Sequence, residues 1–201
     1  MSRMRQMTVV AAAALALGGC SLGGLLGGGG DVPEALLTLT PSAPEPASVV
    51  RAANAGEAVT IRTPVIPEAL RTVRVPVQEG PTAIAYVKDL QWVDTPNELF
   101  QDLLSETVTR MTSRVVLNPS QSALDPGLIV TGHLRRMGYD AQLGAVVVEY
   151  DANLSTAGGT RVETRRFEAT APADGTALTV APALNQAANQ VAMEFAQWIG
   201  S

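Results

Sequence analysis

The segment LGAVVVEYDANLS, residues 143–155, decides the fold of this chain. Apolar and polar side chains alternate along it, and a period of two predicts a β-strand with one buried face and one face in water. The inward set is Val146, Val148, Tyr150, Ala152 and Leu154, and the outward set includes Glu149, Asp151 and Asn153.

A glycine pair directly after this segment predicts how the strand is partnered. Gly158-Gly159 is typical of a two-residue hairpin turn, so a second strand is expected at residues 160–169. A two-residue turn also fixes the register, because every cross-strand pair is then centred on it. The expected pairs are Tyr150 with Phe167 on the inner face and Asp151 with Arg166 on the outer face.

The first of two expected helices follows residues 90–94. Thr95 is the predicted N-cap of a helix over residues 96–114, with Pro96 at the first helical position and Glu98 at the third, a capping box. Apolar residues recur at helical spacing on one face, which indicates that the helix packs on a sheet. They are Leu99, Phe100, Leu103, Leu104, Val108 and Met111.

The second helix closes the chain. It is expected over residues 182–199 and ends at Gly200, while a start as early as Ala177 depends on how Pro182 is accommodated. Its expected buried stripe is Leu184, Ala188, Val191, Phe195 and Trp198.

The other elements are shorter, and together they indicate a single α/β domain without internal repeats. Turn residues rich in Gly and Pro separate runs of β-branched residues. Strands are expected at residues 36–41, 58–66, 72–77, 82–88, 115–117 and 128–137, one helical turn at 67–70 and a turn at 138–142.

The first residues of the chain read as a secretory signal. Arg3 and Arg5 precede a short apolar run that ends in Leu17-Gly18-Gly19-Cys20, too short for a permanent membrane span. Those four residues resemble the lipobox of bacterial lipoproteins, in which cleavage falls before the Cys and acyl chains are attached to it. The resemblance implies a signal peptide at 1–19, cleavage between Gly19 and Cys20, and lipidation of Cys20.

Residues 20–35 would then form a lipidated, glycine-rich tether to a domain spanning 36–201. Ser21 follows the Cys, and in the lipoproteins that the chain resembles a residue other than Asp there accompanies sorting to the outer membrane. The attachment to the membrane is expected to be the lipid alone.

Composition argues against catalysis and against nucleic acid. Without Arg3 and Arg5 the chain carries 12 basic and 19 acidic residues, a net charge of −7, and it has no basic cluster. Its one His, His133, lies mid-strand, and its one Cys is Cys20. We therefore expect no enzyme, cofactor or metal site. Trp92 is expected in the core or at its rim.

Three stretches, together with the order of the segments, resemble the ABC-type transport auxiliary lipoprotein family, which includes the Pqi-type lipoproteins. They are Leu37-Thr38-Leu39-Thr40-Pro41, Val65-Ile66-Pro67-Glu68-Ala69-Leu70, and Leu90-Gln91-Trp92-Val93-Asp94-Thr95-Pro96. The last departs from the commoner Trp-Ala-Glu/Ser-Pro-Leu form. The resemblance implies a mixed, mostly five-stranded sheet with packed helices, in which Pro67, Trp92 and Pro96 are structural.

The same resemblance implies a non-catalytic component of an MCE-type lipid transport system. Its partners would be an MCE-domain protein and the ABC permease and ATPase of the inner membrane. The lipoprotein would face the periplasm of a Gram-negative envelope, lipid-anchored to the outer membrane, and could form a homo-oligomer. The alternative is a lipoprotein of envelope assembly, either a partner of an outer-membrane β-barrel or a Tol-like scaffold.

Overall fold

The hairpin is present with the expected register. In this computed structural model, β6 (Ala145–Ser155) and β7 (Val162–Pro172) pair antiparallel from Ala145 opposite Pro172 to Ser155 opposite Val162. Tyr150 lies opposite Phe167 and Asp151 opposite Arg166, as predicted. The structure describes residues 35–200 apart from 47–49, 55, 122–126 and 157–161, so the glycine turn itself lies outside the described residues.

Seven strands form one mixed sheet, whereas a mostly five-stranded sheet was expected. β5 (Leu128–Asp140) pairs with β6 along nearly its whole length, which leaves only its other edge for further strands. Along that edge β1 (Val59–Ile61) and β2 (Arg74–Gln78) follow one another, both parallel to β5. Beyond them lie β4 (Val116–Leu117), parallel to β1, and β3 (Ile84–Gln91), antiparallel to β2. Seven strands therefore occupy five positions across the sheet.

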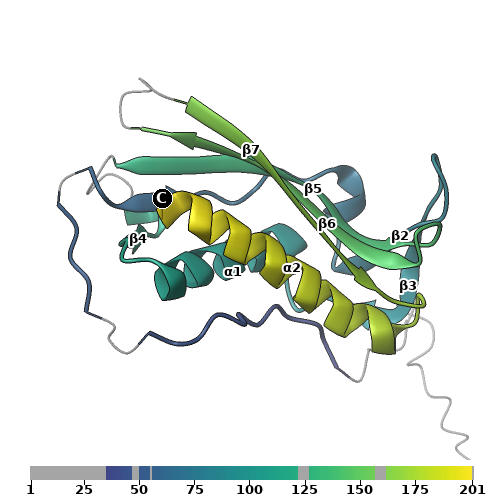
Figure 1. Cartoon of the computed structure of the whole chain (residues 1–201). Helices are drawn as coiled ribbons and strands as arrows, with labels where there is room; N and C mark the ends of the chain where they lie inside the picture. The colour runs from purple at the N-terminus through teal and green to yellow at the C-terminus, as the bar shows by residue number, and fades with distance from the viewer. Residues whose placement is uncertain (1–34, 47–49, 55, 122–126, 157–161, 201) are drawn as a thin grey trace, which may run out of the picture. The chain divides into compact units, whose positions relative to one another are not determined.

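Two helices cover one face of this sheet (Figure 1). They are α1 (Pro96–Met111) and α2 (Ala177–Gly200, yellow), which also pack against each other. Aromatic rings join the layers edge to face: Phe100 of α1 contacts Tyr150, and Phe195 of α2 contacts both Tyr150 and Phe167, with ring centroids 5.2, 6.0 and 5.8 Å apart. The expected α/β class and the helix-on-sheet core are confirmed.

The first helix begins where predicted, with Thr95 as its N-cap residue, but its cap hydrogen bonds and its C-terminal end differ from expectation. The capping box is absent, because the Asp94 carboxylate takes the Thr95 N–H at 2.6 Å and the Thr95 side chain makes no cap bond. The helix ends at Met111 rather than at residue 114, since Thr112 adopts an extended backbone. Pro96 begins the helix as predicted and is buried.

The second helix begins at Ala177, so Pro182 lies inside its second turn. A proline there removes the bond to the Leu178 carbonyl. Leu178 is 86 % exposed, so water can satisfy that carbonyl. Four of the five predicted stripe residues are buried, and Trp198 is only partly buried, in contact with Phe167 and Phe195.

Three strand predictions were wrong in detail. The strand expected at 58–66 is only β1, Val59–Ile61, and Val65 makes an isolated bridge to His133. Residues 36–41 form no strand, only an isolated bridge between Leu37 and Trp92. β5 runs on to Asp140, through a glycine that the sequence suggested was part of a turn. Gly138 is required inside the strand, because a Cβ there would clash with the Pro76 carbonyl of β2. The real turn follows, with Gly144 at φ +62°.

The short connections also match their sequence. A single 3-10 turn, η2 (Glu68–Leu70), follows Pro67, and a second, η3 (Pro119–Gln121), follows β4. Within the described residues, no helix is both long and apolar enough to span a membrane. The signal peptide and Cys20 lie outside the described residues, as does nearly all of the tether.

Candidate functional site

The most distinctive feature outside the core is the segment that enters the domain from its N-terminal side. Residues 37–46, which we call the anchor strap, run along the helices on the side away from the sheet (Figure 1). The strap has no regular secondary structure, so side chains of the helices must satisfy its backbone polar groups.

Two asparagines of α2 hold the strap. The Asn185 Oδ1 accepts the Thr40 N–H at 2.8 Å, and the Asn189 Oδ1 accepts the Ser42 N–H at 2.6 Å. The Nδ2 of Asn189 donates to the Thr40 carbonyl at 2.9 Å and to the Asn185 carbonyl at 2.8 Å. Asn189 is 2 % exposed, so its amide group is buried with both ends in use.

An arginine of α1 holds the next part of the strap. Arg110 donates through Nη1 to the Ala43 carbonyl at 2.9 Å and pairs with Glu106 at 2.8 Å and Glu45 at 3.9 Å. Ala43 itself is 3 % exposed, seated on the helices. The strap is thus joined to both helices over a few residues.

Trp92 joins the start of the strap to the sheet. Leu37 donates its N–H to the Gln91 carbonyl at 2.7 Å and accepts the Val93 N–H at 2.9 Å, while the Trp92 N–H binds the Val73 carbonyl at 2.7 Å. The indole is 1 % exposed, and its Nε1 has no hydrogen-bond partner among the described residues. The expectation of a core tryptophan is confirmed, and its position fixes three segments together.

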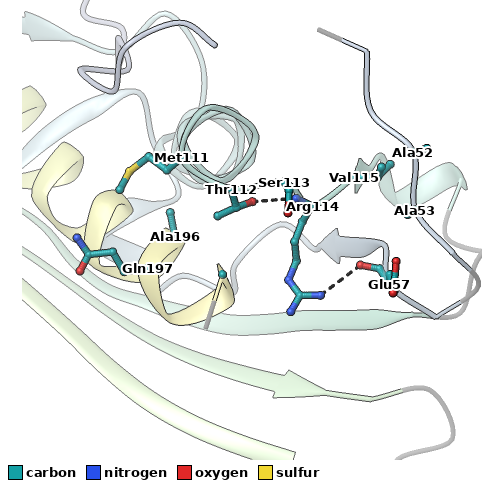
Figure 2. Close-up of a pocket in the computed structure, with 11 residues that line it drawn as sticks. Ala52, Ala53, Glu57, Met111, Thr112, Ser113, Arg114, Val115, Ala196 and Gln197 are labelled. Atoms are coloured by element: carbon teal, nitrogen blue, oxygen red, sulfur yellow. Dashed lines mark hydrogen bonds between the residues drawn. The ribbon is translucent and has the colours of Figure 1, made fainter. Parts of the chain in front are cut away.

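Where the helices end, a polar pocket of about 700 Å³ opens (Figure 2). The C-terminal ends of α1 and α2 meet there, and the unpaired carbonyls of such an end give it a partial negative charge. Arg114 caps α2 by donating to the Ile199 carbonyl at 2.7 Å and reaches the Glu57 carbonyl at 3.3 Å. Arg51 donates to the Thr112 carbonyl just beyond α1. Of these two arginines only Arg114 lines the pocket, and its guanidinium is engaged by the Ile199 and Glu57 carbonyls.

The face of the sheet opposite the helices carries a ladder of charges. Asp151 of β6 accepts hydrogen bonds from Arg166 of β7 at 2.6 and 2.9 Å and from Arg135 of β5. The Arg166 and Arg135 bonds lower the pKa of Asp151 to about 2. Glu149 pairs with Arg166 at 3.0 Å. The Asp151 carboxylate is therefore held ionised as an acceptor, a poor starting point for general acid catalysis.

Two other polar side chains lie on β5. His133 is exposed and stands opposite Asp151 in the register, and Asp140 pairs with Arg136 at 2.6 Å. Among the residues that the structure describes, no group of three or more His, Cys, Asp or Glu could hold a metal ion. Pro67 is exposed and precedes the turn of η2.

Sequence reasoning missed the asparagines that hold the strap. Asn185 and Asn189 lie four residues apart on one helical face, a spacing that places two amides side by side. The signal in the sequence was that Asn189 lies among the apolar residues Ala187, Ala188 and Val191. A buried amide needs hydrogen-bond partners, so such a position predicts a contact with another segment. Their partners are about 145 residues away in the sequence, so the pairing itself could not be predicted.

Comparisons with known proteins agree with this architecture. A model of the ABC-type transport auxiliary lipoprotein component matches residues 37–196. No curated protein matches the chain. The crystal structure of protein XCC0632 from Xanthomonas campestris is 19 % identical, with a TM-score of 0.64, and the match covers 84 % of this chain and 92 % of that one.

Two further solved structures match the chain with lower TM-scores. An uncharacterized protein is 12 % identical with a TM-score of 0.55, over 82 % of this chain and 95 % of that one. A PelC dodecamer from Paraburkholderia phytofirmans is 12 % identical with a TM-score of 0.42, over 77 % of this chain and 93 % of that one. The Xanthomonas campestris protein and the uncharacterized protein, which have the higher TM-scores, share the fold of this chain.

Proposed function

Because this chain belongs to the ABC-type transport auxiliary lipoprotein family, we propose that it is the lipid-anchored docking component of an MCE-type lipid transport system. Membership of the family makes it an auxiliary part of an ABC transport system. The MCE partner, the lipid cargo and the docking role are our proposal. The role is non-catalytic, which accords with the ion-paired state of Glu149 and Asp151.

The anchor is proposed to be Cys20, acylated after cleavage behind Gly19, with the domain on the periplasmic face of the outer membrane. The support is the Leu17-Gly18-Gly19-Cys20 stretch and the serine that follows it. Two or three acyl chains hold a protein at a membrane stably, because each buried CH₂ contributes about 0.8 kcal/mol.

The observation that carries the docking role is the way the chain enters the domain. A docking component must resist displacement between its membrane and its partner, so the last residues before the domain should be fixed to it. The anchor strap meets this need through Asn189 and Asn185 on α2, Arg110 on α1 and Leu37 beside Trp92. Force applied at Cys20 would then reach both layers of the fold.

A crosslinked pull-down of the full-length protein from its own membranes, read by mass spectrometry, tests the proposal. We expect an MCE-domain protein together with its permease or ATPase. Recovery of an outer-membrane barrel protein alone would replace this function with the envelope-assembly alternative. A Cys20→Ala variant should leave the membrane fraction, and its retention there would refute lipid anchoring.

A further inference from the structure

We propose that two copies of this chain join through their β7 strands, antiparallel and centred on Phe167, to form one continuous sheet. β7 is 11 residues long and pairs with β6 alone among the described strands, so no described strand pairs with its other edge. Its pairing with β6 runs without a bulge from end to end. A long, regular edge with free backbone N–H and C=O groups is a template for another strand.

Two rules limit the registers that such a pair can adopt. A twofold axis perpendicular to the sheet keeps helix-covered faces on the same side in both copies. Residues opposite each other must then point to the same face, so each register is centred on a residue and not between two. Near the middle of β7, the candidate centres are Arg166, Phe167 and Glu168.

Only the register centred on Phe167 joins opposite charges. Around the middle of β7 the outward side chains are, in order, Thr164, Arg166, Glu168 and Thr170. In the register centred on Phe167, Arg166 of each copy lies opposite Glu168 of the other copy. Thr164 of each copy likewise lies opposite Thr170 of the other copy. Centring on Arg166 or on Glu168 would instead place like charges directly opposite each other, which is destabilising.

The charges of a single copy leave this pairing available. Glu168 lies directly opposite Glu149 of its own chain, a like-charge pair. The cation between them, Arg166, already contacts Asp151 and Glu149 through Nε, Nη2 and Nη1. A guanidinium carries five N–H groups, so two remain for another carboxylate. Within one copy, Arg166 is shared with Asp151 and Glu149 and is only a partial counterion for Glu168. The second copy's Arg166 would give Glu168 a counterion directly opposite it.

The helix-covered face tolerates the same register. Arg165, whose guanidinium lies over the Phe167 ring at 5.2 Å, would lie opposite the second copy's Ala169, so no like-charged side chain faces it. The only proline of the strand, Pro172, is its last residue and lies outside the central pairs.

Cysteine crosslinking of full-length chains in membranes tests the pairing. Thr164→Cys and Thr170→Cys variants with different tags are co-expressed, oxidised, and separated on a non-reducing gel. Opposite residues of antiparallel strands have Cα atoms about 4.5–5.5 Å apart, within the range of a disulfide. The Thr164 residues of the two copies would instead lie six residues apart along the strands, about 20 Å, which is too far for a disulfide.

We expect a crosslinked dimer that contains both tags when the two variants are mixed, and none from either variant alone. The unsubstituted chain shows whether Cys20 contributes any dimer. No crosslink in the mixture, or an equal one from Thr164→Cys alone, would overturn the proposal.

Glu168→Arg, added to both chains, separates association from folding. It removes the Glu149 opposition within each chain, so the urea midpoint should stay or rise. It also sets an arginine opposite Arg166 of the second copy, so the mixed crosslink should fall at least tenfold. An undiminished crosslink would show that β7 pairs in a different register or not at all.

Discussion

The two faces of the β5–β6–β7 sheet contrast sharply, although the same strands build both. On the helix-covered face Tyr150 and Phe167 are fully buried beneath Phe195. On the open face Glu149, Asp151 and Arg166 form ion pairs at the solvent boundary. Consecutive residues of one strand therefore lie in opposite environments. We expect the covered face to supply most of the stability of the fold, which leaves the open face available for recognition.

The largest expected effect is on the covered face. Phe195→Ala removes the ring that contacts Tyr150, Phe167 and Trp198 and leaves a cavity, so we expect a loss of about 3–5 kcal/mol in the free energy of unfolding. Urea denaturation followed by circular dichroism measures it. Gln197→Ala, an exposed change on the same helix, should stay within about 0.5 kcal/mol. A loss below 1 kcal/mol for Phe195→Ala would mean that this face is not the core.

The second effect concerns the strap. Asn189→Ala leaves the Ser42 N–H and the Thr40 carbonyl without their amide partner, so we expect a loss of about 1–3 kcal/mol. The strap should also open locally, with faster cleavage after Glu45 by a glutamate-specific protease. The exposed neighbour Gln190 provides the control, since Gln190→Ala should alter neither quantity. Unchanged cleavage in Asn189→Ala would refute the amide clamp.

A gain of stability is expected at one core position. The Tyr150 hydroxyl is buried without a hydrogen-bond partner among the described residues, and burial raises the pKa of its phenol. Tyr150→Phe removes an unsatisfied polar group at nearly constant volume, so we expect about 1 kcal/mol of added stability.

The alkaline limb of the stability curve checks the same position. A raised folded-state pKa gives stability that is present below the ordinary tyrosine value near 10 and is lost as the pH rises above it. Tyr150→Phe should therefore weaken the decline in unfolding free energy above that pH. An unchanged alkaline limb would place the hydroxyl in contact with water.

Sequence reasoning succeeded wherever the pattern was local. Alternation along residues 143–155 and the two-glycine turn together fix the Tyr150–Phe167 register, because period and loop length leave one solution. Gly138 was misread, since a glycine in a strand and one in a turn look alike until the approach of Pro76 is known.

Sequence reasoning failed where the partner is distant. Leu37 and Leu39 alternate with threonines like a strand, but the strap runs across α2, and Asn189 takes the place of a neighbouring strand. The expected number of five strands came from the family resemblance, whereas the sequence itself predicted a strand at each of the seven places. β1 and β2 share one edge of β5, so they occupy one position across the sheet although they are two strands in the sequence.

The smallest expected effect belongs to the open face. Asp151→Asn keeps the shape of the side chain and weakens two charged hydrogen bonds, to Arg166 and Arg135. Both arginines are about half exposed, so solvent screens the pairs and we expect a loss of only about 1 kcal/mol at pH 7.

The loss of stability in Asp151→Asn should depend on pH, whereas a loss caused by altered packing would not. Asp151 has a pKa of about 2 in the folded state, below its ordinary value near 3.9, so its stabilisation is complete above the ordinary value and is lost as the pH falls toward 2. The difference between wild type and Asp151→Asn should therefore shrink between pH 5 and pH 2, and also in high salt. Urea unfolding across that range measures it. A difference that persists at pH 2 would assign Asp151 a packing role, and the open face would then contribute to the fold as the covered face does.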